Sequence, residues 1–235
     1  MWLVLLPAAL ASPTGPPLPD PDLTRIDLVV RADSDAWPLA LADCDADSAC
    51  DAVRRDAART LAGSVTLARG VAVYGEWGWT QPSVGEAGYS ATGTRKAAGL
   101  RLGWPVAGMW GLAGNLRVEA EDAAGTNGET EALRAGQLSA MATWGDPLGG
   151  LVVWGGAQAS VLWRQSLSPL GLNSDGEPLV SLTLSPARPA SAVFGAALWS
   201  DSLGAPWRRG ARITLGAEGW LGQSNGGSAW IGLGF

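Results

Sequence analysis

The sequence predicts an all-β chain folded as a closed antiparallel transmembrane barrel of about 10–12 strands. From about Thr60 onward, polar and apolar residues alternate, and a period of two is typical of strands with two different faces. The apolar faces run for about nine to eleven residues, the length that crosses a bilayer at a tilt. Hydrophobic residues make up 47% of the chain and charged residues 16%. No run reaches the roughly 18 apolar residues that a membrane helix needs.

The first residues have the form of an export signal. Residues 2–6 are apolar, and Ala9-Leu10-Ala11 has the small-x-small form of a signal-peptidase site. The pattern departs from the usual one because no positive residue follows Met1 and the apolar stretch is short. We expect a signal peptide over residues 1–11, followed by an extended, proline-rich linker over residues 12–22.

Residues 23–59 are expected to form an N-terminal strand and an acidic loop. The strand covers residues 25–31, in which Ile26, Leu28 and Val30 share one face. The loop, residues 33–51, is rich in aspartate.

Two features of this loop suggest additional chemistry. Cys44 and Cys50 are close in an exported chain, which predicts a small disulfide loop, with two free thiols as the alternative. Asp43, Asp45 and Asp47 have the spacing that begins a calcium loop, but the following glycine and the closing acidic residue are missing. The sequence therefore favours a solvated acidic loop over a calcium site.

Residues 60–235 are expected to form the barrel, which must close because unpaired strand edges cannot face lipid. Short connections are expected near residues 69–70, 105–108, 145–149 and 186–190, and long ones near residues 81–95, 121–130 and 165–177. Apolar alternation identifies strands around residues 64–67, 71–79, 100–104, 110–118, 138–143, 151–164, 180–184, 213–217 and 229–235.

The last seven residues carry a resemblance to a known class of protein. Ala229, Ile231, Leu233 and Phe235 share one face of a strand, and the chain ends on the aromatic residue. This segment resembles the terminal assembly signal of Gram-negative outer-membrane β-barrels, with Ile231, Leu233 and Phe235 as the signal residues. The resemblance implies location in the cell outer membrane, assembly by the barrel-assembly machinery, short turns in the periplasm and long loops outside.

Strand counting conflicts with one part of that pattern. Counting from Thr60 gives ten strands when the stretch between the connections near residues 186–190 and 200–208 is included, and residues 25–31 make an eleventh. With the short turns in the periplasm, Phe235 would then lie on the outer side. Either the connection near residues 200–208 is misread, or the N-terminal segment contributes a further strand. The strand number and the side of the membrane that each connection faces therefore stay open.

The tryptophans are expected to form girdles at the two membrane interfaces. The chain has 13 tryptophans, and several lie near strand ends, where such girdles occur. Ordinary core tryptophans are the alternative. The residues assigned to the interfaces are Trp77, Trp79, Trp104, Trp110, Trp144 and Trp163.

The polar face of the strands predicts a charged lumen. Its expected role is a network of ion pairs that fills the interior, because an unpaired buried charge is unfavourable. A narrow conduit for small solutes is the alternative, since about ten strands leave little open space. The stretch from Glu119 to Glu131 is also expected to form an acidic exterior loop. The residues assigned to the lumen are Glu76, Arg101, Arg117, Glu119, Arg164, Arg212 and Glu218.

Composition excludes several function classes. The chain has no histidine, which removes catalytic arrangements that depend on imidazole and the commonest transition-metal ligand. We expect no catalytic residue, metal or cofactor, and the net charge of −6 indicates no nucleic-acid partner. The expected role is structural or an unassigned surface function, as a monomer in outer-membrane lipid. The alternatives are a narrow passive pore and a soluble lipocalin-like or adhesin binding barrel, whose apolar residues would face inward.

Overall fold

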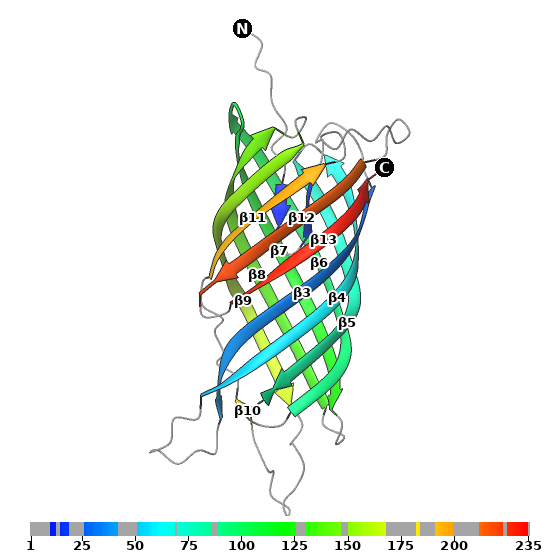
Figure 1. Cartoon of the computed structure of the whole chain (residues 1–235), viewed down its shortest axis with the longest axis vertical. Coiled ribbons are helices and arrows are strands. Elements are labelled where there is room, and N and C mark those ends of the chain that lie inside the picture. The colour runs from blue at the N-terminus through cyan, green and yellow to red at the C-terminus, as the bar shows by residue number, and fades with distance from the viewer. Residues whose placement is uncertain are drawn as a thin grey trace, which may run out of the picture.

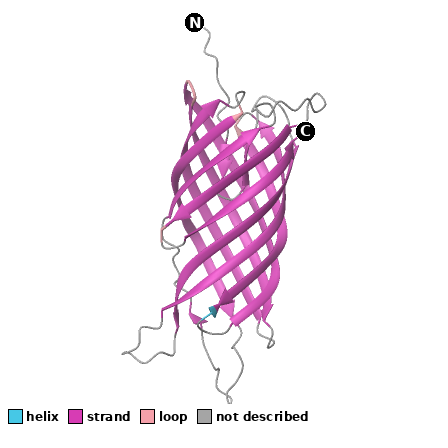
Figure 2. Ribbon diagram, in the orientation of Figure 1, coloured by secondary structure: helices cyan, strands magenta, loops and turns pink. Residues whose placement is uncertain are grey.

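The computed structural model is a closed barrel of ten antiparallel strands, as the sequence predicted (Figures 1 and 2). It describes residues 10–12, 15–18, 26–41, 51–68, 70–85, 89–125, 130–146, 150–167, 182–183, 191–199, 212–222 and 225–234. In ring order the wall is β3 (Ile26–Leu41), β4 (Asp51–Ala68), β5 (Val71–Val84), β6 (Tyr89–Ala107), β7 (Trp110–Gly125), β8 (Thr130–Asp146), β9 (Leu151–Leu167), β11 (Ser191–Trp199), β12 (Arg212–Leu221) and β13 (Asn225–Gly234).

The barrel closes between its first and last strands. β13 pairs with β3 from Gly234–Asp27 to Asn225–Ala36, and β3 pairs with β4 along its other edge. Every wall strand therefore has a neighbour on both sides, which removes the open edge that could not face lipid. Among the described residues, no helix is long and apolar enough to cross a membrane.

Apolar side chains face outward and polar side chains face inward. Burial alternates residue by residue along β5, β7 and β13. Outward residues such as Leu28, Leu116 and Ile231 are about half exposed, whereas the buried set includes aspartate, glutamate and arginine. A soluble barrel has the opposite arrangement. The barrel is therefore an integral β-barrel of the outer membrane, and the soluble alternative does not fit its surface.

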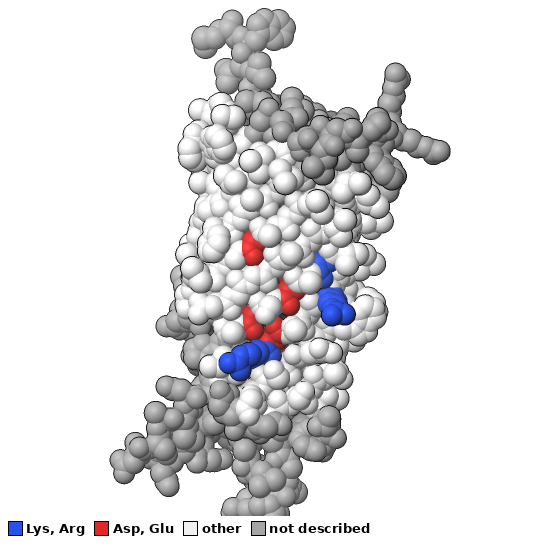
Figure 3. Space-filling view, in the orientation of Figure 1, with Lys and Arg blue, Asp and Glu red and all other residues white. Residues whose placement is uncertain are grey.

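Charged residues are confined to one zone of the face of the barrel that Figure 3 shows. On this face, the part of the wall nearer the beginning of β3 and the end of β13 shows no Lys, Arg, Asp or Glu, and such residues lie nearer the other end. The beginning of β3 and the end of β13 lie at the same end of the barrel (Figure 1). This end also holds the tight turns at Gly70 and Gly108, which have positive φ angles of 71° and 57°. By the rule that short turns are periplasmic, it is the periplasmic end.

The structure resolves the conflict in strand number. The strand expected at residues 180–184 does not cross the membrane. Its only described part is β10 (Leu182–Thr183), which pairs with Leu41 and Ala40 at the outer end of β3. Removing this strand leaves an even number, so β13 ends at the periplasmic end. β11 ends and β12 begins at that same end, because Leu198 of β11 pairs with Leu151 at the start of β9 and Arg212 of β12 pairs with Gly234.

The barrel begins earlier in the chain than expected. Residues 26–41 and 51–68 are wall strands, so the boundary expected at residue 60 falls inside β4. The long connections expected at residues 81–95 and 121–130 are mostly strand, because β5 to β8 extend well beyond the apolar band. Cys44 and Cys50 lie outside the described residues, as do Asp43, Asp45 and Asp47. The disulfide and the loop therefore remain predictions.

A short hairpin precedes the wall. β1 (Leu10–Ser12) pairs with β2 (Gly15–Leu18), and β1 lies near β6, β7 and β8 whereas β2 lies near β3. This hairpin includes the last two residues of the segment expected to be a signal peptide. Cleavage after Ala11 remains a prediction.

Four inward aromatic residues each lie across from a glycine on the neighbouring strand. The register pairs are Tyr74 with Gly99, Trp154 with Gly195, Trp230 with Gly216, and Trp220 with Gly226. A Cβ atom at any of these glycines would approach the partner ring to between 2.3 and 2.7 Å. The missing side chain lets each ring lie flat against the wall, an arrangement known to support glycines in sheets.

The outward tryptophans agree with an interfacial position. Trp110 and Trp144 are register partners at the periplasmic end, and both are exposed, as is Trp104. Trp77 and Trp79 are exposed further toward the outer end. The side chain of Trp163 lies outside the described residues. Not every tryptophan belongs to a girdle, because Trp154, Trp220 and Trp230 are buried inside the barrel.

Candidate functional site

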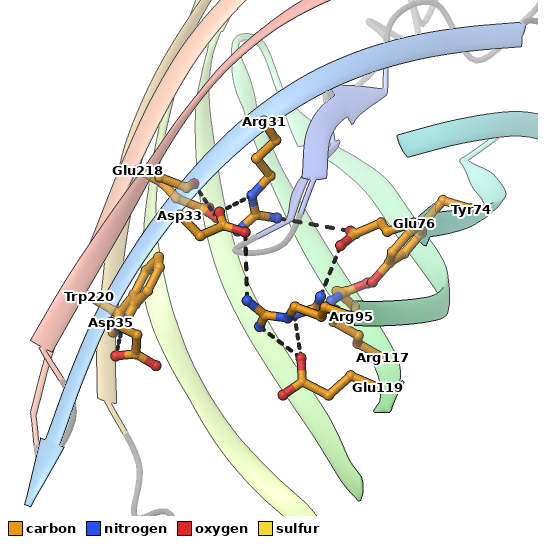
Figure 4. A network of polar contacts seen from close by, with 12 residues as sticks. Arg31, Asp33, Asp35, Tyr74, Glu76, Arg95, Arg117, Glu119, Glu218 and Trp220 are labelled. Carbon is orange, nitrogen blue, oxygen red and sulfur yellow. Dashed lines mark hydrogen bonds and ion pairs between the residues drawn. The ribbon is translucent and has the colours of Figure 1, made fainter. Parts of the chain in front are cut away.

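The interior holds a network of charged side chains contributed by five strands (Figure 4). Alternation along each strand directs these side chains inward. Their side chains are between 0 and 14% exposed. The network consists of Arg31 and Asp33 on β3, Glu76 on β5, Arg95 on β6, Arg117 and Glu119 on β7, and Glu218 on β12.

Arg117 lies between two carboxylates. Its Nη2 atom is 2.9 Å from Glu76 Oε2, and its Nη1 atom is 3.0 Å from Glu119 Oε2. All three side chains are at most 3% exposed. Charge-assisted hydrogen bonds of this length are among the strong ones in proteins, so Arg117 ties β5 to β7 through the lumen.

Arg95 and Arg31 complete a ring of alternating charge. Arg95 Nη2 is 2.9 Å from Glu119 Oε2, and Arg95 Nη1 is 3.7 Å from Asp33 Oδ2. Arg31 donates a hydrogen bond from Nε to Asp33, and its Nη1 atom is 3.9 Å from Glu76 Oε1. Three arginines and three carboxylates therefore form a closed circuit across the lumen. Because the signs alternate, every charge in the ring has opposite charges as neighbours.

Glu218 is attached to this ring from β12, which is separated from β3 only by β13. Its Oε1 atom is 3.8 Å from Arg31 Nη2 and accepts a hydrogen bond of 3.3 Å from the Ser228 hydroxyl. β12 and β13 are thereby linked to β3 across the interior. We call the ring together with Glu218 the lumen network.

Aromatic residues fill the interior beside the lumen network. The guanidinium of Arg101 lies 4.2 Å from the centre of the Tyr74 ring, within the range of a cation–π contact. The Tyr74 hydroxyl donates a hydrogen bond of 3.0 Å to Asn115. Trp154 and Trp230 have ring centres 6.0 Å apart. Bulky groups therefore accompany the ion pairs inside the barrel.

Toward the outer end the interior becomes acidic. Thr80 donates a hydrogen bond of 3.2 Å to Glu121, and Tyr89 donates one of 3.0 Å to Glu131. Both glutamates are buried. The exterior acidic loop expected between Glu119 and Glu131 is therefore wrong in the described part, because these residues lie on β7 and β8. β7 and β8 continue beyond the last residues that show an apolar alternation, so the sequence pattern does not reveal their outer ends.

Five of the expected lumen residues are inside the barrel. Glu76, Arg101, Arg117, Glu119 and Glu218 are all buried. Arg164 and Arg212 lie on β9 and β12, but their side chains are outside the described residues.

Sequence reasoning missed a second group of interior charges. Arg31 is placed at the end of the expected strand over residues 25–31 with no lumen role, Asp33 in the acidic loop, and Arg95 in a long connection. The face that carries Ile26, Leu28 and Val30 continues through Ala32 and Ser34, and the residues between them are polar except for Val29. The continued alternation could have identified these interior charges from the sequence, because it places Asp27, Arg31 and Asp33 on one face of a longer strand.

The interior side chains fill the lumen and join different strands through ion pairs and hydrogen bonds. Among the described residues, no group of three or more histidine, cysteine, aspartate or glutamate side chains is arranged to hold a metal ion. Within the ring, each carboxylate lies between two arginines. The arrangement can brace the wall and occupy the lumen.

Comparison with known proteins gives only distant likenesses. No family model matches the chain, and no curated protein matches it. The translocator domain of the autotransporter NalP from Neisseria meningitidis has 13% identity and a TM-score of 0.48, with 91% of this chain and 88% of that chain covered. The toluene transporter TbuX of Ralstonia pickettii has 8% identity and a TM-score of 0.33, with coverages of 90% and 89%. Likenesses of this size carry no argument about role.

Proposed function

We propose that the protein is a closed, non-conducting outer-membrane barrel with a structural or surface-presenting role. The observation that carries this proposal is the lumen network, which links β3, β5, β6, β7 and β12 across the interior. The size of the barrel supports the same conclusion. Eight strands are just filled by side chains and 16 to 18 leave a wide channel, so ten strands with arginines and aromatic rings inside leave little free cross-section.

The proposal includes no catalytic activity and a monomeric state in outer-membrane lipid. The absence of histidine supports the first part. The complete ring of paired strands supports the second, because no strand edge of the wall needs a second copy to pair with.

The purified barrel is expected to give no open-channel steps in a planar bilayer. The reason is that the ion pairs and rings occupy the lumen at the depth of the apolar band. A Tyr74→Ala/Arg101→Ala variant, which removes two large interior side chains outside the lumen network, provides the comparison. Small steps from this variant alone would support a filled lumen, and steps from the unaltered barrel would contradict it.

A narrow cation-conducting pore is the second candidate. It is favoured by the excess of carboxylates over arginines among the buried charged residues. Because an interior of net negative charge concentrates cations, any current through the unaltered barrel should reverse near the equilibrium potential of the cation. Measuring the reversal potential under a salt gradient separates this candidate from leakage around a damaged barrel.

Assembly by the barrel-assembly machinery is part of the proposal. Ile231 and Leu233 point outward and are 53% and 47% exposed on β13, as expected of an accessible terminal signal. Deleting Phe235 is therefore expected to lower the amount of folded barrel in the outer membrane several-fold. Heat-modifiable gel mobility of the membrane fraction measures this amount.

An Asp47→Ala variant is the control for the Phe235 deletion. It changes the expected acidic loop and leaves the terminal strand intact, so its folded level should match that of the unaltered chain. Equal folded levels for the deletion and the control would remove the terminal signal from the proposal.

A further inference from the structure

The outer wall carries an unusual group of exposed side chains on three neighbouring strands. Arg59 of β4 is the register partner of Trp79 on β5, and Lys96 of β6 is the register partner of Trp77 on β5. Direct partners on one face of a sheet have Cβ atoms about 4.5–5.5 Å apart. The two tryptophan rings contact each other edge to face, with centres 4.8 Å apart. We call these four residues the basic–aromatic cluster.

All four side chains are outside the barrel. Trp77 and Trp79 are 45% and 60% exposed, and Arg59 and Lys96 are also exposed. None belongs to the lumen network or reaches the interior.

The basic–aromatic cluster lies at the outer edge of the apolar band. On the same three strands, residues toward the periplasmic end are apolar, for example Leu61, Val73 and Leu100. Toward the outer end they are polar, for example Gln81 and Thr92. The change places Arg59 and Lys96 where the acyl chains of a lipid end and its headgroup begins.

The charge at this edge is predominantly positive. Among the described strand residues, the exposed basic side chains are Arg55, Arg59, Lys96 and Arg134, whereas Asp122 is the exposed acidic one. Asp122 is already paired with Arg134 at 2.7 Å. A partner of the remaining positive groups must therefore be anionic and must have an apolar part that lies along the wall.

We propose that the basic–aromatic cluster binds the phosphorylated headgroup of a lipid in the outer leaflet. Arg59 and Lys96 contact the phosphate oxygens, and the exposed Trp77–Trp79 pair packs against the headgroup and the beginning of the acyl chains. Indole rings favour this depth because one edge donates a hydrogen bond while the ring is apolar. The inference goes beyond the proposed function, since the closed barrel would need no such site in order to stay closed.

The test is a lipid titration of the full barrel followed by native mass spectrometry in detergent. The probe is a bisphosphorylated diglucosamine lipid, and the comparison probe is the same lipid with both phosphates removed. An Arg59→Gln/Lys96→Gln variant is expected to bind the phosphorylated lipid about 30-fold more weakly, at roughly fivefold per basic residue. Its binding of the dephosphorylated lipid should be unchanged.

An Arg55→Gln/Arg134→Gln variant is the matched control. It removes the same number of positive charges from the same face but leaves the basic–aromatic cluster intact, so its affinity should change by no more than about twofold. Heat-modifiable mobility verifies that both variants are folded. Equal weakening by both variants would show attraction to general surface charge and overturn the site, as would no weakening by either.

Inorganic phosphate distinguishes a lipid site from an ion site. Because the apolar part of the lipid contributes to binding, millimolar phosphate should not displace the phosphorylated lipid. Displacement at that concentration would overturn the assignment to a lipid and indicate a site for the free ion.

Discussion

Replacing Arg117 by leucine is expected to lower the free energy of unfolding of the barrel by about 3–5 kcal/mol. The substitution leaves Glu76 and Glu119 without the guanidinium that lies 2.9 and 3.0 Å from them. Both carboxylates are buried, so the loss is dominated by an uncompensated buried charge and not by a lost packing contact. Unfolding by urea in lipid vesicles, followed by tryptophan fluorescence, measures the change.

The surface ion pair of Arg134 with Asp122 provides the control. Their side chains are 45% and 54% exposed, and exposed pairs contribute about 0–1 kcal/mol. Arg134→Leu should therefore have little effect on unfolding. An Arg117→Leu/Glu76→Gln variant should recover part of the loss, since Glu119 keeps Arg95 at 2.9 Å whereas Glu76 keeps only Arg31, at 3.9 Å. Similar stability for Arg117→Leu and Arg134→Leu would mean that water replaces the buried guanidinium without penalty.

Replacing Gly216 by valine is expected to destabilise the barrel by about 1–3 kcal/mol or to displace Trp230 from the wall. A Cβ atom at Gly216 would lie 2.3 Å from Cζ2 of the Trp230 ring. The ring cannot simply rotate away, because it is buried and its centre lies 6.0 Å from that of Trp154. The same unfolding experiment measures stability, and near-ultraviolet circular dichroism reports on the tryptophan environment.

Gly75→Val is the matched control for Gly216→Val. Gly75 faces outward on β5, and a Cβ atom there would meet only the carbonyl oxygen of Ala97, at 4.0 Å. Both changes add the same side chain to a strand, so they share any effect on backbone propensity. Equal losses in the two variants would contradict a specific role for the ring–glycine pair.

The barrel class could be predicted because one face of each strand must match the bilayer. Val73, Leu116 and Ile231 each belong to a strand in which every second residue is on the apolar face, and all three point outward in the structure. The inner face gave a weaker signal. Glu76, Arg117 and Glu119 could be placed inside by alternation, but nothing local indicated that Arg117 bridges the other two.

The errors arose where the apolar signal fades. Beyond the membrane edge a strand needs no apolar face, so β3, β7 and β8 continue through residues whose composition is typical of loops, such as Asp33 and Glu121. The opposite error occurred at residues 180–184, where apolar alternation suggested a crossing strand. A wall strand needs backbone hydrogen bonds to a neighbour along its length, whereas β10 pairs with β3 over two residues only.

The sequence by itself determined the β-architecture and which residues share a face of each strand. Those properties depend on each residue's own polarity and on a period of two, which are local. The tertiary structure alone decided the strand number, the closure of β3 on β13, and the ring that joins Arg31, Glu76, Arg117, Glu119, Arg95 and Asp33. The physical reason is that these pairings join residues far apart in the chain, such as Asp33 with Arg95 and Asp27 with Gly234, so they follow from closure of the whole barrel.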